Sequence, residues 1–128
     1  MKKWIFLFLA VICLTACGQV KEKEQEAVYV NITVQEAKRI MDSEEGYVIL
    51  DVRTREEYDQ GHIPGAILIP DTEISEKAEN VLTDKEQLIL VYCRSGRRSK
   101  LAAQCLVDLG YTNIREFGGI LDWPYEVE

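Results

Sequence analysis

A single cysteine lies in a basic stretch of the chain that has the residue types needed for thiol chemistry. Residues 91–100 read V-Y-C-R-S-G-R-R-S-K, so three arginines surround Cys93, and Gly96 can adopt a positive φ. The residues before Cys93 are apolar and β-favouring, and an apolar helical periodicity begins after Ser99. This pattern predicts a strand, a tight loop and a helix. Backbone N–H groups, the helix N-terminus and the arginines would bind an anion and lower the pKa of the thiol.

The elements that must position this loop follow from hydrophobic patterning. Two capping boxes, Thr33 with Glu36 and Thr54 with Glu57, predict helix starts, and further helices are expected over residues 74–82 and 101–109. Gly46 is expected to end the first helix and Gly110 the last, and Gly118-Gly119 to form a turn. Short β-like runs predict strands over residues 28–32, 47–52, 67–69, 88–92 and 112–117.

This alternation of strands and helices predicts an α/β fold. We expect one domain over residues 28–128, with a central, mostly parallel five-stranded sheet and helices on both faces. Ligands bind such sheets at the carboxyl ends of the strands, where Asp51 and Cys93 both fall. Asp51 is expected to order the loop or to pair with Arg53, and both are interpreted as supporting residues.

The N-terminal residues have a targeting pattern. Lys2 and Lys3 precede an apolar run over residues 4–14, which is too short to span a bilayer, and the run closes with L-T-A-C at Cys17. This ending resembles the bacterial lipobox, which implies a signal peptide over residues 1–16 and a lipidated Cys17 carrying a diacylglyceryl group and, in many bacteria, an added acyl chain such as palmitate. An ordinary cleaved signal peptide with an incidental cysteine is one alternative, and a buried N-terminal helix is another, which is less favoured because nothing in the sequence pairs with so apolar an end. The polar residues 17–27 are interpreted as a tether that holds the domain in the bacterial cell envelope, outside the cytoplasm.

The charge balance argues against a polyanionic partner. The chain has 22 acidic and 15 basic residues, a formal net charge of −7. Removal of residues 1–16 would take away two lysines and no acid, leaving 13 against 22, or −9. Such a body repels nucleic acid and anionic lipid, so the expected membrane contact is the lipid anchor alone. The basic loop can still attract small anions.

Three stretches together resemble one known family. They are the loop at Cys93, the pair D-V-R at residues 51–53 and G-H-I-P-G-A at residues 61–66, and G-G-I at residues 118–120 with Trp123. In this order they resemble the rhodanese-like sulfurtransferases, and in particular the small single-domain rhodaneses of the bacterial cell envelope. The resemblance runs over roughly residues 29–123.

The resemblance implies a reaction and a site. The Cys93 thiolate would take a sulfane sulfur from an anionic donor such as thiosulfate, form a persulfide, and pass the sulfur to cyanide, a thiol or a protein acceptor. Backbone N–H groups of the loop would steady the persulfide, and the arginine side chains would bind the donor. The expected substrate-binding residues are Arg94, Ser95, Gly96, Arg97, Arg98 and Ser99.

Other functions remain open. A membrane-anchored persulfide or sulfenate relay would use the same thiol, and rhodanese-like domains also serve as protein-binding modules, usually with the cysteine replaced. Cysteine phosphatases and arsenate reductases also place a thiolate before a helix, but their loops resemble C-x5-R. Here Ser99 occupies the arginine position and Arg98 is one residue short, which favours sulfur over a tetrahedral oxyanion.

The remaining candidate residues have structural interpretations. A disulfide between Cys93 and Cys105 fits poorly because Cys105 lies about 9 Å along the helix from Ser99, and Cys105 is expected to pack in the core. His62 and Trp123 are interpreted as structural. The acids of the short second helix, Glu57 among them, are expected to face solvent. No metal or cofactor is expected, since no cluster has metal-ligand spacing and no nucleotide-binding loop is present.

Overall fold

The computed structural model describes residues 28–128. The predicted signal peptide, the lipidation at Cys17 and the tether therefore lie outside the described residues. Within the described part of the chain, no helix is long and apolar enough to cross a membrane.

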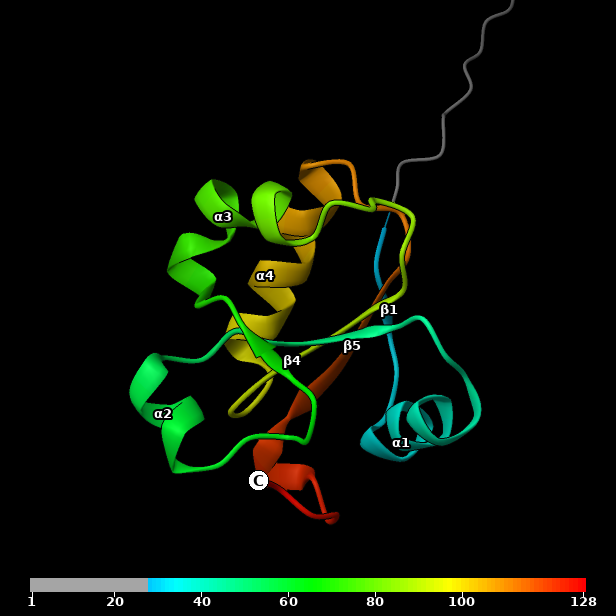
Figure 1. The fold of residues 1–128 in the computed structure, drawn as a ribbon, viewed down its shortest axis with the longest axis vertical. Helices are drawn as coiled ribbons and strands as arrows, with labels where there is room; N and C mark the ends of the chain where they lie inside the picture. Colours follow the sequence, from blue (N-terminus) through cyan, green and yellow to red (C-terminus); the bar gives the residue numbers. More distant parts are fainter. Residues whose placement is uncertain (1–27) are drawn as a thin grey trace, which may run out of the picture.

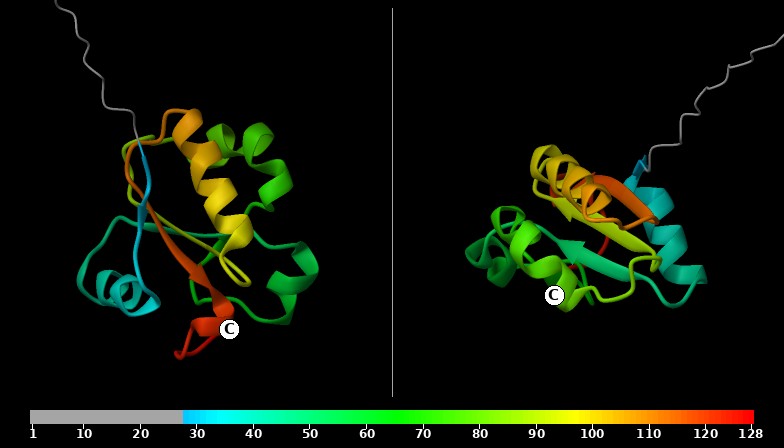
Figure 2. Two further views of the ribbon diagram at one scale, coloured as in Figure 1. Left: turned by 180° about the vertical axis from the view of Figure 1, so that it is seen from behind. Right: turned by 90° about the horizontal axis from the view of Figure 1, so that it is seen from above.

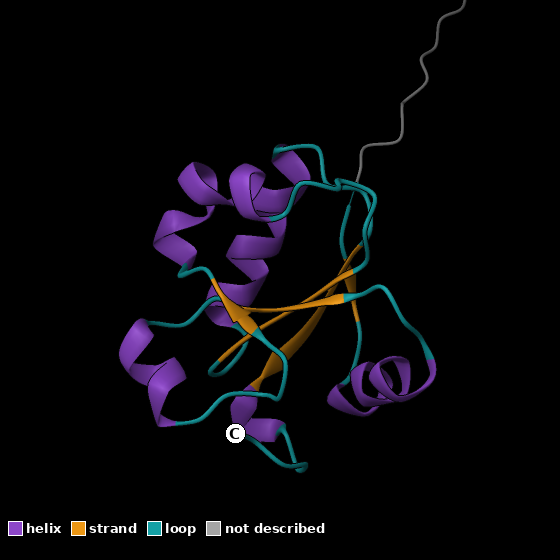
Figure 3. Ribbon diagram, viewed as in Figure 1, coloured by secondary structure: helices purple, strands orange, loops and turns teal. Residues whose placement is uncertain are grey.

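The core of the fold is a five-stranded sheet whose strands are all parallel (Figure 3). The spatial order is β1-β5-β4-β2-β3, so the strand that ends at Cys93 is the central one. The predicted α/β class is confirmed. The strands are β1 (Val30–Asn31), β2 (Val48–Asp51), β3 (Ile67–Leu68), β4 (Ile89–Cys93) and β5 (Ile114–Gly119).

The helices lie on both faces of this sheet (Figure 1). Those on one face, α3 (Ile74–Val81) and α4 (Arg97–Asp108), are in contact with each other and lie side by side in Figure 2. The other face is covered by α1 (Val34–Ser43) and the C-terminal segment, and Tyr58 of α2 (Arg55–Gln60) packs there too. Two 3-10 helices, η2 (Asp71–Glu73) and η3 (Ile120–Asp122), connect these elements.

Local signals explain where α1 and α2 begin. In each helix the N-cap threonine accepts a hydrogen bond from the backbone N–H three residues on, and the glutamate there accepts one from the threonine N–H. Both predicted capping boxes, at Thr33 and Thr54, are confirmed. Helix α1 ends at Ser43 with Glu44 as its C-cap, two residues before the glycine expected to end it.

The two faces of the central strand bury different residues. Val91 and Cys93 belong to the apolar cluster under α3 and α4, whereas Leu90 and Tyr92 belong to the cluster under α1. All residues of β4 are buried, as expected of a strand covered on both faces. The alternation of side chains along β4 therefore aims Cys93 at α4.

Two predicted boundaries beside the site are wrong. Helix α4 begins at Arg97, because Gly96 caps it in the left-handed region (φ 111°), whereas the apolar periodicity could only mark the helix from Leu101. Gly118-Gly119 is not a turn but the end of β5, where Gly119 pairs with Cys93. A strand ending in glycines carries no β-propensity signal, so the sequence pattern ended it early.

Candidate active site

Cys93 lies at the bottom of a cradle made by the loop and the first turn of α4. The residue is fully buried, and the Gly96 N–H donates to its Sγ across 3.0 Å. Sγ also lies 3.5 Å from Ser99 Oγ. The site is therefore a strand end facing a helix N-terminus, with backbone donors aimed at sulfur.

Hydrogen bonds govern the ionisation of this thiol. Burial raises the pKa of Cys93, but hydrogen bonds from the Ser99 side chain and from the N–H groups of Ser99, Gly96 and Ser95 outweigh burial. The pKa consequently lies below its ordinary value. The lowered pKa agrees with the expectation. Its causes are the oriented hydrogen-bond donors, whereas the sequence analysis expected the arginine charges to contribute as well.

Ser99 is held from behind by a residue that the sequence analysis did not single out. Its hydroxyl donates to the carboxylate of Glu116, which is 1% exposed. Glu116 lies on the same face of β5 as the core residue Ile114, two positions away. The sequence does contain one indication of this role: Glu116 is an acid at a position of the strand that alternation with Ile114 places on its apolar face.

The expected anion-binding arginines have different environments. Arg98 is partly buried and donates to both carboxylate oxygens of Glu57, at 2.8 and 3.0 Å. The prediction that Glu57 faces solvent is therefore wrong, because the Glu57 side chain of α2 points toward the loop and pairs with Arg98. Arg94 and Arg97 are exposed. A cavity of about 320 Å³ opens beside the loop, with Arg94 and Arg53 among its lining residues.

A buried ion pair supports the strand end next to Cys93. Asp51 is 0% and Arg53 5% exposed, and Arg53 Nη2 lies 2.7 Å from Asp51 Oδ2. The Tyr92 hydroxyl donates to the same oxygen across 2.6 Å, and it accepts from the Ile63 N–H. Arg53 also donates to the Gly61 carbonyl. Of the two roles expected for Asp51, the pairing with Arg53 is what the structure shows, and it ties β2, β4 and the turn after α2 together.

The loop also depends on a glycine of β5. A Cβ at Gly119 would overlap the Arg94 carbonyl and lie 2.6 Å from the Ser95 nitrogen. The Arg94 carbonyl in turn accepts from the Leu121 N–H across 3.1 Å. Only glycine lets the loop after Cys93 rest directly on the end of β5.

The two cysteines of the described residues are both free. The prediction that Cys93 and Cys105 are not bridged is thus confirmed. Cys105 is half-buried against the cluster under α3 and α4, and burial raises the pKa of its thiol. Leu101, one turn earlier in α4, is 61% exposed.

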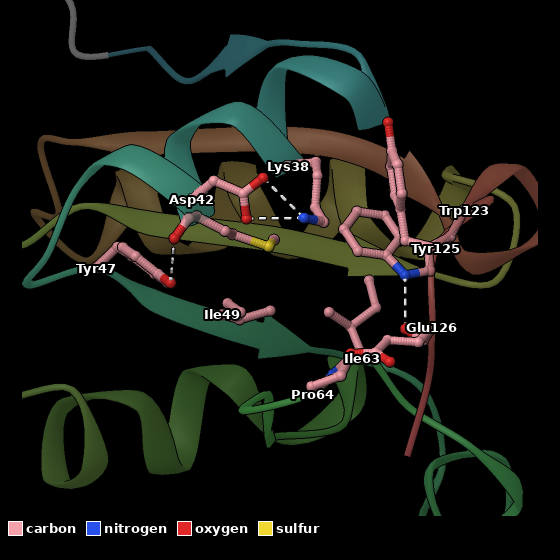
Figure 4. Close-up of a pocket in the computed structure, with 10 residues that line it drawn as sticks. Lys38, Asp42, Tyr47, Ile49, Ile63, Pro64, Trp123, Tyr125 and Glu126 are labelled. Atoms are coloured by element: carbon pink, nitrogen blue, oxygen red, sulfur yellow. Dashed lines mark hydrogen bonds and ion pairs between the residues drawn. The ribbon is translucent and has the colours of Figure 1, made fainter.

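His62 and Trp123 have the structural environments that were expected. The His62 ring stacks on Tyr58 with centroids 3.8 Å apart, and its Nδ1 lies 3.0 Å from the Tyr58 carbonyl. Trp123 is 9% exposed and donates through Nε1 to the Glu126 carbonyl. Figure 4 shows it at the wall of a separate cavity of about 200 Å³ between α1 and the C-terminal segment. Cys93 does not line that cavity.

Among residues 28–128, no group of three or more histidine, cysteine, aspartate or glutamate side chains is arranged to hold a metal ion. The chemistry that this site can perform with its own groups is that of a buried, activated thiol in a cradle of N–H donors. Such a thiol attacks soft electrophiles.

Comparison with known proteins agrees with this geometry. A family model described as "Rhodanese-like domain" matches residues 33–125. The chain is 41% identical over 73 residues to thiosulfate sulfurtransferase PspE of Escherichia coli, covering 57% of this chain and 70% of PspE. It is 39% identical over 98 residues to the putative sulfur carrier protein YrkF of Bacillus subtilis, covering 76% of this chain and about half (52%) of YrkF. A solved structure titled "rhodanese with anions from E. coli" is similar with a TM-score of 0.60 at 36% identity, covering 64% of this chain and 96% of that one.

Proposed function

The chain belongs to the rhodanese-like domain family, and on this premise we propose that it transfers a sulfane sulfur from an anionic donor such as thiosulfate through a persulfide on Cys93. The observation that carries the proposal is the buried Cys93 Sγ with the Gly96 N–H 3.0 Å away and a lowered thiol pKa. A lowered pKa increases the fraction of thiolate, which is the nucleophile that the reaction requires.

The reaction has two displacements at sulfur. The Cys93 thiolate attacks the outer sulfur of thiosulfate, a Cys93 S–S bond forms, the S–S bond of thiosulfate breaks, and sulfite leaves with the electron pair. An acceptor such as cyanide or a thiolate then attacks the outer sulfur of the persulfide. The Cys93 S–S bond breaks, and the thiolate returns with that electron pair. No external oxidant is needed, because the transferred sulfur is already at the sulfane level.

The N–H groups of Ser95, Gly96 and Ser99 are suited to hold the anionic sulfur in both steps. Arg94 and Arg97 are suited to hold the sulfonate end of the donor, because they are exposed beside the loop. Arg98 is in a different position, since Glu57 already neutralises it. We therefore assign Arg98 to holding α2 against the loop and only secondarily to the donor.

The position of Ser99 supports sulfur transfer over phosphoryl or arsenate chemistry. This position would carry the oxyanion-clasping arginine of a C-x5-R loop, but here a serine turns inward to the Glu116 carboxylate. This position of the loop therefore offers no guanidinium group to clasp a tetrahedral oxyanion beside the sulfur.

A second candidate function is a persulfide relay to a protein or thiol partner. It is favoured by the similarity to YrkF, which is named a putative sulfur carrier protein. A relay would load sulfur on Cys93 as a transferase does but would release it poorly to cyanide. A purely protein-binding role has less support, since the cysteine is present and activated.

The test is steady-state thiocyanate release from thiosulfate and cyanide. The protein should turn over, and Cys93→Ser should be inactive while Cys105→Ser, the matched control thiol, keeps the activity. Loading of sulfur without thiocyanate release would favour the relay. Turnover of a phosphoryl substrate with no reaction toward thiosulfate would contradict the proposal.

We also propose that Cys17 carries a lipid and anchors the domain outside the cytoplasm in the bacterial cell envelope. The L-T-A-C ending after an apolar run supports this proposal. When the full chain is expressed in a bacterium with labelled palmitate, the label should appear in the membrane-bound protein and disappear in Cys17→Ser. Equal labelling of Cys13→Ser and the unchanged chain is the expected control result. An unlabelled or fully released wild-type chain would contradict the anchor.

A further inference from the structure

A buried carboxylate lies behind the reactive cysteine, one hydroxyl away. Glu116 Oε2 accepts the Ser99 hydroxyl and the Gly118 N–H, the latter across 2.9 Å, and Oε1 lies 3.3 Å from Lys100 Nζ. Since Ser99 Oγ is also 3.5 Å from Cys93 Sγ, a continuous chain of polar atoms runs from sulfur to carboxylate. The two-step sulfur transfer described above does not use this acid.

The Ser99 hydroxyl is a single donor with too many acceptors. Besides the sulfur and the carboxylate, it approaches the carbonyls of Gly96, at 3.1 Å, and Gly118, at 3.3 Å. A hydroxyl has one hydrogen to donate, and its shortest contact is with Glu116. A charged acceptor forms the stronger hydrogen bond, so the hydrogen points at Glu116 and a Ser99 lone pair faces Cys93. This arrangement suits a protonated thiol, whose S–H can donate to Ser99.

A thiolate reverses that preference. A thiolate is stabilised when the Ser99 hydroxyl donates its hydrogen to the sulfur. While that hydrogen points at Glu116, the negative sulfur faces a lone pair of the Ser99 oxygen and a nearby carboxylate, and both disfavour its charge. We propose that Glu116 is a positioning residue which competes with Cys93 for the hydroxyl hydrogen of Ser99 and thereby holds back ionisation of the cysteine. No bond to sulfur is made or broken by Glu116. Ionisation of Cys93 requires only that the hydroxyl rotate from the carboxylate toward the sulfur.

Several charged groups from neighbouring elements face this chain. Lys100 of α4 offsets the Glu116 charge, and Asp122 of η3 lines the same cavity as Glu116. The guanidinium of Arg98 is paired with Glu57, which is the main cause that raises the pKa of Arg98, and the Cys93 charge is a smaller one. The adjacent edge strand β1 contributes neutral Asn31 opposite Glu116. Among residues 28–128, Glu116 is the one acid that shares a hydrogen-bond donor with the cysteine.

The inference deepens the proposed function and rests on it for its biological meaning, because it states what limits the supply of thiolate for sulfur transfer. Its test does not need sulfur transfer. The rate at which iodoacetamide alkylates Cys93 is measured against pH in a Cys105→Ser background, and the midpoint of the profile reports ionisation. A protein with no sulfurtransferase activity but with the expected shifts would contradict only the proposed function.

Glu116→Gln should move the midpoint of the alkylation profile to lower pH by about one unit, because the charged competitor for the Ser99 hydrogen is gone. At a pH below the midpoint, this shift corresponds to about tenfold more thiolate. Ser99→Ala should move it to higher pH, since the sulfur loses a donor. With Ser99→Ala already present, Glu116→Gln should shift the midpoint by less than half as much. Glu86→Gln, the same change on an exposed residue before β4, is the matched control and should shift nothing.

A merely structural role for Glu116 would lower stability or the alkylation rate at every pH and leave the midpoint in place, and that result would overturn the proposal. An equal shift with and without Ser99 would overturn it too, because the effect would then not pass through the hydroxyl. Should Glu116→Gln fail to fold, Lys100→Gln, a change at a half-exposed surface residue, leaves the carboxylate uncompensated and should raise the midpoint. An unchanged or lowered midpoint in that variant counts against the proposal.

Discussion

The guanidinium of Arg98 and the carboxylate of Glu57 form a bidentate ion pair between α4 and α2, with nitrogen–oxygen distances of 2.8 and 3.0 Å. Both side chains are partly buried, 19% and 25% exposed. The pair joins the first turn of α4, which holds the thiol cradle, to the capping residue of α2. It therefore divides the arginines of the loop into one that is already neutralised and two that face solvent.

This division predicts different effects for the arginines. Arg97→Gln combined with Arg94→Gln should raise the KM for thiosulfate about tenfold with little change in kcat or in stability, because each removes an exposed positive charge near the donor. Arg98→Gln should instead lower the free energy of unfolding, by on the order of 1–3 kcal/mol. Steady-state kinetics and urea denaturation of the variants check both parts. A KM that responds to Arg98 alone would contradict the assignment.

The ion pair also predicts a pH dependence of stability. Hydrogen bonding to Arg98 is the main cause that lowers the pKa of Glu57 from 4.5 to about 2 in the folded protein. Because the folded pKa is below the unfolded one, the stabilisation is present in full above about pH 4.5 and is lost as the pH falls toward about 2.

Glu57→Gln should therefore destabilise the protein at pH 7, by on the order of 1–2 kcal/mol, and much less near pH 2. Urea denaturation at both pH values measures the difference. Glu36→Gln is the matched control, since Glu36 has the same capping role in α1 without an arginine partner among its hydrogen bonds. A loss for Glu57→Gln that is equal at both pH values would show that capping, not the ion pair, is responsible.

The buried pair of Asp51 and Arg53 should be more sensitive. Asp51→Asn removes the carboxylate that Arg53 and the Tyr92 hydroxyl share, and leaves the arginine charge buried without a counter-ion. The expected loss in the free energy of unfolding is about 3–5 kcal/mol. Asp42→Asn, which breaks the exposed pair with Lys38, should cause little change. Similar, small losses in the two variants would contradict the structural role given to Asp51.

Gly119 should be the most sensitive glycine for activity. Gly119→Ala places a methyl group against the Arg94 carbonyl and must push the loop away from β5. We expect kcat/KM to fall at least tenfold and the free energy of unfolding to fall by about 1–3 kcal/mol. Gly46→Ala is a control for backbone strain, because Gly46 has a positive φ of 80° but its Cβ would meet no atom within 4 Å. Gly46 also precedes β2, at the end of the parallel strands opposite to Cys93. Loss of activity in both variants with the same loss of stability would argue that only folding is affected.

Much of the fold could be predicted because local signals and tertiary demands agree. The apolar run before Cys93 is a central strand buried on both faces, and the two threonine capping boxes start helices where they were expected. The apolar periodicity does not reveal the first turn of α4, because residues 97–100 are polar or charged. Local patterning favours a turn at Gly118 and Gly119, because glycine pairing within a sheet depends on what lies opposite, here Cys93 opposite Gly119.

The candidate site could be predicted only in part, for a similar reason. Cys93 can be identified from the sequence because its neighbours in the chain form its cradle. The residues that reach the site from other elements cannot be identified in this way. Local pattern indicates a solvated helix residue at Glu57 and an ordinary strand residue at Glu116, whereas in the fold α4 places Arg98 against Glu57 and Ser99 against Glu116. Contacts across 41 and 17 positions of the chain depend on how the helices pack, which no local pattern records.

Whether Cys93 itself carries the sulfur can be read from the intact mass of the purified protein after incubation with thiosulfate. The mass should increase by one sulfur atom, and the increase should be lost again on treatment with cyanide or a reducing thiol. The gain should be absent in Cys93→Ser and retained in Cys105→Ser. A wild-type chain of unchanged mass, or a Cys93→Ser chain that still gains sulfur, would show that Cys93 is not the sulfur carrier.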